Sequence, residues 1–272
     1  SQPEFEQVEL EATAEGPLAG LTHRGALRAA NVTLPRLQPV EVAGEWRGLG
    51  ATLESWNAAA RAGASEITAR GSLSDATLTL TEASLRQGDA VRLALTAPAS
   101  VRWRPGVRIE SVQLAGPDGR IRGTVTLGAS GRIELAAEHV ASPWFSDFVT
   151  LPGPAWTLTR LGLTGQWDRG PAQFAVDASA ALEIGDDRTA VVDVQGGGTA
   201  DGLRIEALRV RESDATVVDA RGRLPLAWVP AGNPSVRIDP GGELTFDASV
   251  APHPVFWNKI AALTGVTLED PR

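Results

Sequence analysis

The sequence predicts an all-β protein built mostly as an antiparallel sheet, and three observations lead to that prediction. Apolar and polar residues alternate over long stretches, turn-forming residues separate these stretches, and one short apolar pattern recurs five times. Alternation with a period of two places apolar side chains on one face of a strand and polar side chains on the other. Strand patterns recur every ~10–15 residues with few long helical patterns between them, which favours the all-β class.

The clearest strand pattern covers residues 174–184, where every second residue is apolar and polar residues such as Asp177 and Glu183 lie between them. A strand of this kind belongs to a sheet with one dry face and one wet face. Glycine, proline and aspartate clusters predict the turns between strands. These turns are expected at residues 116–119, 185–187, 196–198 and 240–242.

The recurring pattern consists of four apolar residues at offsets 0, +2, +5 and +7. The second pair has the opposite parity to the first, so a regular strand would turn the two pairs to opposite faces. A β-bulge, which adds one residue, would return both pairs to one face and bend the sheet, and we favour this interpretation. The alternative is a break into two short strands. The five copies are Leu27-Ala29-Val32-Leu34, Leu78-Leu80-Ala83-Leu85, Val107-Ile109-Val112-Leu114, Trp156-Leu158-Leu161-Leu163 and Leu203-Ile205-Leu208-Val210.

Three segments depart from the strand pattern and predict short helices. Residues 143–151 and 254–263 each begin with proline and carry apolar residues at offsets that share one helical face. Residues 53–62, with Leu53 and Trp56 on one face, form the third. The first two segments either plug an open end of the sheet or line an apolar groove. Their aromatic residues are Trp144, Phe145, Phe148, Phe256 and Trp257.

Each aromatic segment follows a run of strands, which predicts two repeat units, 1–152 and 153–272. The net charge of −8 argues against nucleic acid as a partner. Without cysteine the chain has no disulfide, thiolate chemistry or Cys-based zinc site. No stretch approaches the ~20 apolar residues of a membrane span. Because the chain opens on Ser1 and has no methionine, we expect it to be a segment of a longer protein whose membrane anchor lies upstream.

No residue cluster in the sequence indicates catalysis, a cofactor or a metal ion, and we expect the protein not to be an enzyme. The histidines lack ligand spacing, and two of them precede the aromatic segments, which favours a structural role. The acidic cluster of Glu183, Asp186 and Asp187 is more typical of a solvated hairpin tip than of a cation site. A pair of catalytic carboxylates of the glycosidase kind is not excluded by the sequence, but no sequence feature identifies such a pair. The histidines are His23, His139 and His253.

Residues 203–210, a polar turn and then residues 220–226 resemble the recurring phrase of the AsmA-like proteins, with the TamB-type branch most similar. The element Gly222-Arg-Leu-Pro-Leu226, followed by residues 244–248 and an aromatic segment, carries this resemblance. The resemblance runs through most of the chain, as the five apolar patterns do. It implies a long, curved, mostly antiparallel sheet (a repeating β-groove, or β-taco) with an apolar concave face and two or three short helices.

The resemblance also implies a function. Such proteins are anchored in the inner membrane of diderm bacteria, bridge the periplasm and conduct phospholipids to the outer membrane, or support outer-membrane protein assembly with a barrel protein as partner. The ligands would be phospholipid acyl chains, and no catalytic residues are implied. The candidate groove residues are Leu80, Leu93, Leu95, Trp103, Ile133, Leu135, Phe174, Val176, Leu182, Leu244 and Phe246.

Two other classes of protein remain open from the sequence. The first is a structural or adhesive β-solenoid or sandwich, in which the same apolar residues form a closed core. The five patterns start 51, 29, 49 and 47 residues apart, which is irregular for a β-helix. The second is a carbohydrate-active β enzyme, supported only by the eight tryptophans.

Overall fold

The computed structural model describes residues 5–17, 20–33, 35–151, 153–185, 188–231, 234–251 and 256–257. Strands account for 73% of the described residues, the pairing is antiparallel, and no α-helical element is assigned among them. The predicted all-β class is confirmed. The chain divides into two compact units, a first unit of residues 1–125 and 142–151 and a second unit of residues 126–141 and 152–272. The predicted division at residue 152 differs from these bounds over residues 126–141.

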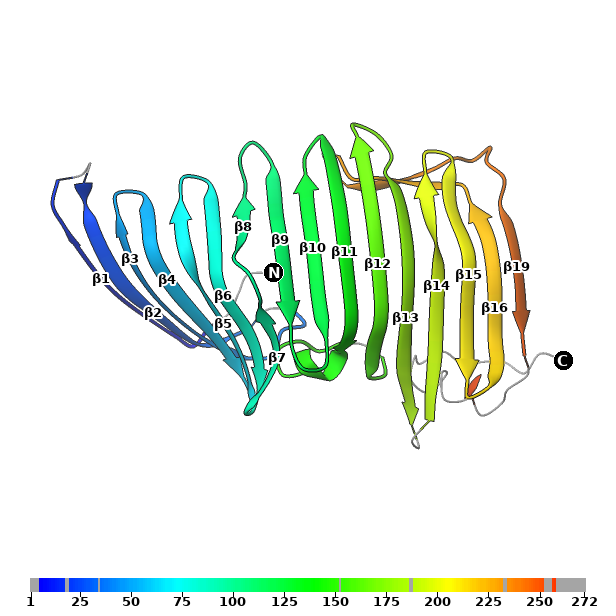
Figure 1. Cartoon of the computed structure of the whole chain (residues 1–272), viewed down its shortest axis with the longest axis horizontal. Helices are drawn as coiled ribbons and strands as arrows, with labels where there is room; N and C mark the ends of the chain where they lie inside the picture. Colours follow the sequence, from blue (N-terminus) through cyan, green and yellow to red (C-terminus); the bar gives the residue numbers. More distant parts are fainter. Residues whose placement is uncertain are drawn as a thin grey trace. The chain divides into compact units, whose positions relative to one another are not determined.

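In the described part of the first unit, each strand pairs with its neighbour in sequence (Figure 1). At one edge β6 pairs with both β7 and β8, and these two pair in turn with β9. The strands are β1 (Gln7–Glu15), β2 (Thr22–Val32), β3 (Val40–Leu49), β4 (Thr52–Ala62), β5 (Ser65–Ser74), β6 (Thr77–Gln87), β7 (Ala90–Leu95), β8 (Ala99–Arg102) and β9 (Val107–Ala115). Residues of both units occur in β10 (Arg120–Leu127).

The second unit has the same sequential pairing, interrupted by one hairpin. Its main strands are β11 (Ser130–Ala141), β12 (Trp156–Asp168), β13 (Gln173–Gly185), β14 (Arg188–Thr199), β15 (Gly202–Glu212), β16 (Ala215–Leu224) and β19 (Thr245–Val250). The hairpin of β17 (Leu226–Val229) and β18 (Ser235–Ile238) lies between β16 and β19 in sequence and packs against β14 and β15. In Figure 1 it runs across the ends of the unit's strands.

The β-bulge interpretation of the recurring pattern is confirmed in four of the five copies, which show a register shift between their two apolar pairs. In β6, for example, Thr81 is the extra residue between Leu80 and Glu82. The third copy lies within β9, where Ser111 has a φ of 50° and the partner strand changes from β8 to β7. In the described residues of the four copies with a register shift, the bulge therefore keeps both apolar pairs on one face. Leu34, which closes the first copy, lies outside the described residues.

Glycine stands opposite two of these bulges because the bulge brings a backbone carbonyl close to the neighbouring strand. A Cβ added to Gly71 would lie 1.9 Å from the carbonyl oxygen of Thr79, and one added to Gly196 would lie 2.3 Å from that of Arg204. Both distances are far below the ~3.5 Å of ordinary contact. The turn predicted at residues 196–198 is therefore wrong, since these glycines belong to β14 and accommodate its neighbour.

The expected two or three short helices are not borne out. Residues 53–62 lie in β4, where a register shift between Leu53 and Trp56 puts both side chains on one face, so a bulged strand imitates helical spacing. Residues 143–151 contain only a four-residue 3-10 helix, η2 (Ser142–Phe145). Of residues 254–263, only Phe256 and Trp257 are among the described residues.

The segment after η2 closes one end of the first unit's sheet. Trp144 and Phe148 are each 5% exposed. The Gln38 amide donates to the carbonyl of Phe148 (2.8 Å), and the Thr150 amide donates to the carbonyl of Arg36 (2.9 Å). Turn hydrogen bonds continue through the Val149 amide, which donates to the carbonyl of Phe145 (2.9 Å), and the chain then runs beside the segment that leads into β3.

Asp147 fixes the same segment to the turn between β4 and β5. Its Oδ2 accepts a hydrogen bond from the Ser65 hydroxyl at 2.7 Å and another from the Ala64 amide at 3.2 Å. Ser65 is 2% exposed, so this carboxylate satisfies a donor that has little access to water. Residues 142–151 therefore serve as a polar and aromatic cover over the strand ends.

The second unit is covered at both ends of its strands. At one end Phe256, 3% exposed, packs in a core with Ile184, Ala190 and Val217. At the other end Trp228 of β17 lies with its ring centroid 6.2 Å from those of both Trp167 and Phe174. The hydrophobic core of this unit is therefore concentrated at the strand ends.

Candidate functional site

The apolar face of the second unit is ordered in rows that run across the strands. Directly opposed residues of antiparallel strands share a face, so the register defines each row. Row A is Leu135, Leu163, Val176, Gly196, Ile205, Gly222 and Phe246. Row B is Ala137, Leu161, Ala178, Val194, Leu208, Ala220 and Ala248. Both rows cross seven strands without a charged residue.

Rows A and B lie between the two covers. The aromatic contacts of Trp228 and the core around Phe256 involve residues outside both rows. Most members of the rows are half-buried; Ala137 and Ala220 are buried, and on β19 Phe246 reaches 60% exposure. The rows form an apolar strip that is neither a sealed core nor an ordinary wet surface.

The strip is longer than an acyl chain. Six inter-strand gaps of ~4.8 Å give a strip about 29 Å long. A bilayer core of about 30 Å holds two acyl chains end to end, so one chain needs about 15 Å. One unit therefore provides enough apolar length for a whole acyl chain lying across its strands.

The candidate groove residues of the second unit fall into three environments. Leu135, Val176 and Phe246 belong to row A, and Ile133 lies one row further out, opposite Gly165. Phe174 contacts Trp228 of the hairpin, and Leu182 packs against the core around Phe256. Each of these two residues therefore contacts one of the covers at the strand ends. Leu244 precedes β19 and is 64% exposed.

The first unit has a comparable strip but fewer of the candidates lie on it. Leu80 lies opposite Gly71 on the apolar face, and Leu93, 3% exposed, lies buried against Leu85. Leu95 lies opposite Leu114, and Trp103 is 39% exposed just beyond β8. The middle row of this unit, row C, is Leu10, Leu27, Gly44, Ala58, Ala69 and Ala83.

The candidate groove residues predicted from the sequence include none of the alanines and glycines of these rows. Alanine and glycine carry little hydrophobic signal, and the bulges shift their parity along each strand. Each bulge shifts the pairing register by one residue. If that shift is included when strands are aligned, the alanines and glycines fall opposite the apolar residues of the neighbouring strands.

Large aromatic side chains lie over glycines on the strand next to them. A Cβ on Gly25 would come within 2.3 Å of the Trp46 ring, and one on Gly131 within 2.0 Å of the Trp167 ring. Each glycine is directly opposite its aromatic partner in the register. The rings therefore lie flat along the sheet instead of standing up from it, which keeps the apolar face smooth.

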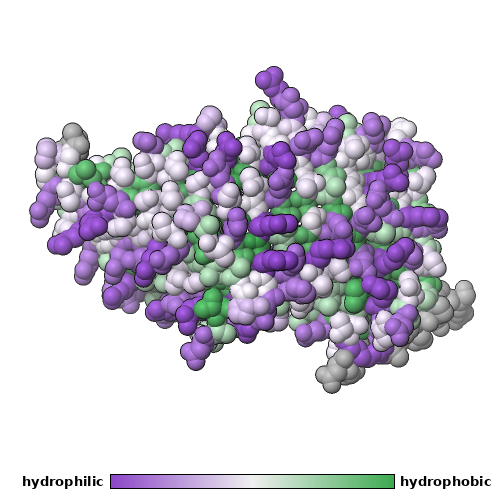
Figure 2. Space-filling model, viewed as in Figure 1, coloured by the Kyte–Doolittle hydropathy of each residue, from purple (hydrophilic) through white to green (hydrophobic). Residues whose placement is uncertain are grey.

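The opposite face of each sheet is polar and carries rows of ion pairs. Arg209 pairs with Asp219 at 3.3 Å, and Arg160 pairs with Asp177 at 2.7 Å. Figure 2 shows hydrophilic side chains on the side turned to the viewer, with apolar ones between them. Exposed pairs of this kind contribute little stability individually. They keep this face of the sheet wet, in contrast to rows A, B and C.

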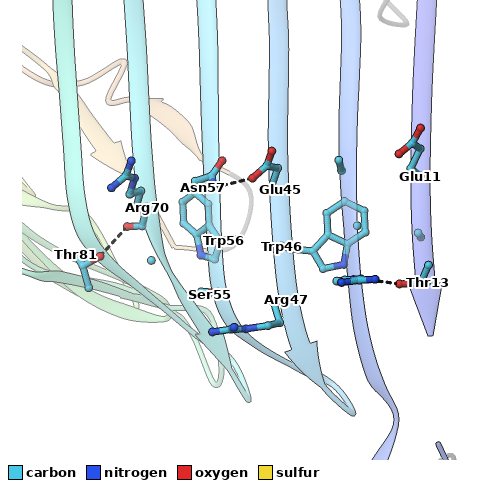
Figure 3. A pocket seen from close by; sticks show the side chains of 15 residues that line it. Glu11, Thr13, Glu45, Trp46, Arg47, Ser55, Trp56, Asn57, Arg70 and Thr81 are labelled. Atoms are coloured by element: carbon cyan, nitrogen blue, oxygen red, sulfur yellow. Dashed lines mark hydrogen bonds between the residues drawn. The ribbon is translucent and has the colours of Figure 1, made fainter. Parts of the chain in front are cut away.

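A cavity of about 860 Å³ lies over the sheet of the first unit, lined by residues of β1 to β6 that include Trp46 and Trp56, which share a face with row C. Figure 3 shows its side chains already engaged with one another: Asn57 donates to Glu45 (3.4 Å), and the Thr81 hydroxyl donates to the carbonyl of Arg70 (3.3 Å). Among the residues that the structure describes, no group of three His, Asp or Glu side chains could hold a metal ion. The cavity is therefore lined by several paired polar side chains together with two tryptophan rings.

Asp193 lies on the polar face of the second unit, and its pKa is lowered from the ordinary value. Burial on its own would raise the pKa of Asp193, but hydrogen bonds from Ser179 and Arg211 and the charges of Arg211 and Arg160 outweigh it and lower the pKa. The Arg211 guanidinium lies 2.7 Å from its Oδ2. A lowered pKa in the folded state means that this carboxylate stabilises the fold when it is ionised.

We expect Asp193→Asn to lower the free energy of unfolding by about 1 kcal/mol at pH 7. The difference from the unchanged protein should be full above the unfolded pKa of about 3.9 and should vanish as the pH falls through the lowered folded pKa. Urea unfolding at pH 7 and pH 3 measures it. Asp201→Asn, in an exposed turn, is the matched control; an Asp193→Asn deficit as large at pH 3 as at pH 7 would contradict the assignment.

The histidines and the acidic cluster do not form a site in the described residues. His139 is exposed and has a φ of 52°, beside the bulge of β12, and His23 lies against Gly48. His253, Asp186 and Asp187 lie outside the described residues.

Comparison of the chain with protein-family models, curated proteins and solved structures finds no match. Among the described residues, no helix has the length and apolar character needed to cross a membrane. The fold and the apolar rows are therefore the basis for considering function.

Proposed function

We propose that the apolar faces of the two units hold phospholipid acyl chains, and that the protein is part of a conduit for phospholipids between the inner and outer membranes of a diderm bacterium. The observation that carries the proposal is the half-buried apolar strip of rows A and B, which runs across seven strands between two covers. The resemblance to the AsmA-like, TamB-type proteins supports the same function. An inner-membrane anchor upstream and an outer-membrane barrel partner belong to this proposal, as does support of outer-membrane protein assembly.

The physical basis for conduction is that apolar burial has no preferred direction. Each Å² of acyl chain that leaves water contributes about 25 cal/mol wherever it lies along the strip. Rows A and B contain no charged or hydrogen-bonding side chain that would fix a chain at one position. A chain that moves by one strand exchanges one set of apolar contacts for another, so no catalytic group or cofactor is required.

The alternative of a closed structural core needs a second layer over these rows. In the described part of the second unit, the other sheet is the hairpin of β17 and β18, which packs against β14 and β15 near the strand ends. Burial at the two covers fits either function. The half-buried state of Leu163, Val176 and Leu208 favours the lipid strip.

The proposal predicts that a photoreactive amino acid at Val176 will cross-link phospholipid. The purified chain would be incubated with vesicles of phosphatidylethanolamine and phosphatidylglycerol, irradiated and analysed by mass spectrometry. We expect a yield roughly tenfold above that from Ala175, which neighbours Val176 but faces the polar side, because only row A contacts acyl chains. Leu208 in row B should behave like Val176.

Two outcomes would count against the lipid strip. Equal yields at Val176 and Ala175 would show contact without face selectivity, and an absence of lipid adducts at both Val176 and Leu208 would favour a sealed core. A charge in row A, Leu163→Arg, should reduce the yield at Val176, whereas Thr164→Arg on the polar face should not.

A further inference from the structure

Strand β19 forms an edge of the second unit's sheet with unusually exposed apolar side chains. Among the described residues it pairs with β16 alone, and Figure 1 shows it at the margin of that unit. Phe246 is 60% exposed and Val250 is 57% exposed. An edge strand with an exposed apolar face is a template for another strand unless the sequence protects it.

The backbone of β19 directs a regular set of donors and acceptors toward that edge. The Ala251 amide donates to the Val217 carbonyl at 2.9 Å, and these two residues continue the register of β16 with β19. Hydrogen-bonded and non-hydrogen-bonded pairs alternate along an antiparallel ladder. Phe246, Ala248 and Val250 therefore turn their N–H and C=O groups away from β16 and toward the edge.

The charges of β19 do not protect this edge, in contrast to those of β1 at the margin of the first unit. β1 carries Glu9, Glu11 and Glu15 within nine residues, and such a run of carboxylates opposes strand addition. The only charged residue of β19 is Asp247, and Arg221 of β16 neutralises it at 2.7 Å.

We propose that β19 pairs in antiparallel fashion with β19 of a second copy of this chain, about a twofold axis at Ala248. In this register Ala248 faces Ala248 of the second copy and Phe246 faces Val250 of the second copy, so the residues with outward N–H and C=O groups face each other. Asp247 then lies opposite Ser249 of the second copy. A twofold axis at Asp247 would place the two Asp247 carboxylates opposite each other. A register shifted by one residue would place the apolar face of one strand beside the polar face of the other.

This pairing would make the apolar strip continuous between two copies. Row B ends at Ala248, so it would pass directly into row B of the second copy. The inference stands on strand geometry and charge and does not depend on lipid binding. Because only six-residue strands meet, the interface is small, and we expect a weak dimer that forms reversibly with concentration.

Cysteine cross-linking tests the register, since the chain has no cysteine of its own. Directly opposed residues in a hydrogen-bonded antiparallel pair have Cα atoms about 5.5 Å apart, which suits a disulfide. We expect Ala248→Cys to form a covalent dimer under mild oxidation. Phe246→Cys alone should not, whereas a mixture of the Phe246→Cys and Val250→Cys proteins should.

Charge exchange tests the same contact without a covalent bond. Ala248→Glu and Ala248→Lys should each shift the concentration for half-dimerisation at least tenfold upward in sedimentation velocity, because like charges would oppose each other at the axis. Mixing the two variants should restore dimers. Ala12→Glu, an exposed alanine on edge strand β1, is the matched control and should leave the dimer unchanged.

Several outcomes would overturn the proposal. A chain that stays monomeric to about 0.5 mM together with no covalent dimer from Ala248→Cys would do so. Equal cross-linking from Ala248→Cys and Phe246→Cys would indicate random collision, and failure of the mixed Glu and Lys variants to associate would place the contact elsewhere. Unchanged circular dichroism of each variant shows that the fold is intact.

Discussion

Replacing Trp144 with alanine is expected to lower the free energy of unfolding of the first unit by about 3–5 kcal/mol. The indole is 5% exposed in the cover formed by residues 142–151, and truncation would remove its apolar contacts and leave a cavity over the strand ends. Urea unfolding followed by circular dichroism measures the change. A loss of this size is a large part of the 5–15 kcal/mol that stabilises a typical domain.

The matched control for this substitution is Trp103→Ala in the same unit. Trp103 is 39% exposed beyond β8, so we expect a loss below about 1 kcal/mol. Equal losses at the two tryptophans would mean that residues 142–151 do not hold the end of the sheet. A smaller loss with Phe145→Ala, whose ring is half-buried, would support the order of burial in this cover.

Replacing Gly71 with alanine is expected to cost about 2–3 kcal/mol, although it adds only a methyl group. The new Cβ would lie 1.9 Å from the carbonyl oxygen of Thr79, and that oxygen belongs to the backbone of the bulged strand β6. Neither atom can move without shifting the strand pairing. Thermal unfolding, with amide exchange in β5 and β6, would report both the loss and its location.

Gly162→Ala is the control for a strand glycine with room beside it. The nearest atom to its added Cβ is 3.9 Å away, an ordinary contact. This variant should be neutral or slightly stabilising, because glycine loses more conformational freedom on folding than alanine does. A neutral Gly71→Ala would show that the bulge of β6 tolerates a shift, and the glycine would then not be needed for the bend.

The all-β class and the position of four bulges could be predicted from the sequence, because both follow from the parity of apolar residues. The same parity argument explains the main error, since a bulge in β4 gives Leu53 and Trp56 a spacing that also suits a helix. Glycines 196–198 suggested a turn for a related reason. Glycine marks tight turns and close backbone approaches equally, and only the neighbouring strand decides between them.

The candidate site could be predicted only in part. Large apolar residues such as Leu135 and Val176 stand out in the sequence, and both lie in row A. Leu93 and Leu182 have the same local pattern but are packed beneath other residues, because burial depends on which distant segment covers a strand end. Residues 142–151 cover strands that lie far earlier in the chain, and no local sequence pattern indicates this position.

That cover has a consequence for how the first unit folds. Successive strands pair with their sequence neighbours, so β1 to β6 can zip together hairpin by hairpin, and single hairpins form in about 1–10 μs. The contacts of the cover close much longer loops, with Ser65 and Asp147 82 residues apart and Gln38 and Thr150 112 residues apart. The sheet can therefore form before this cover docks, and until then Trp144 and Phe148 are exposed to water and to other nascent chains.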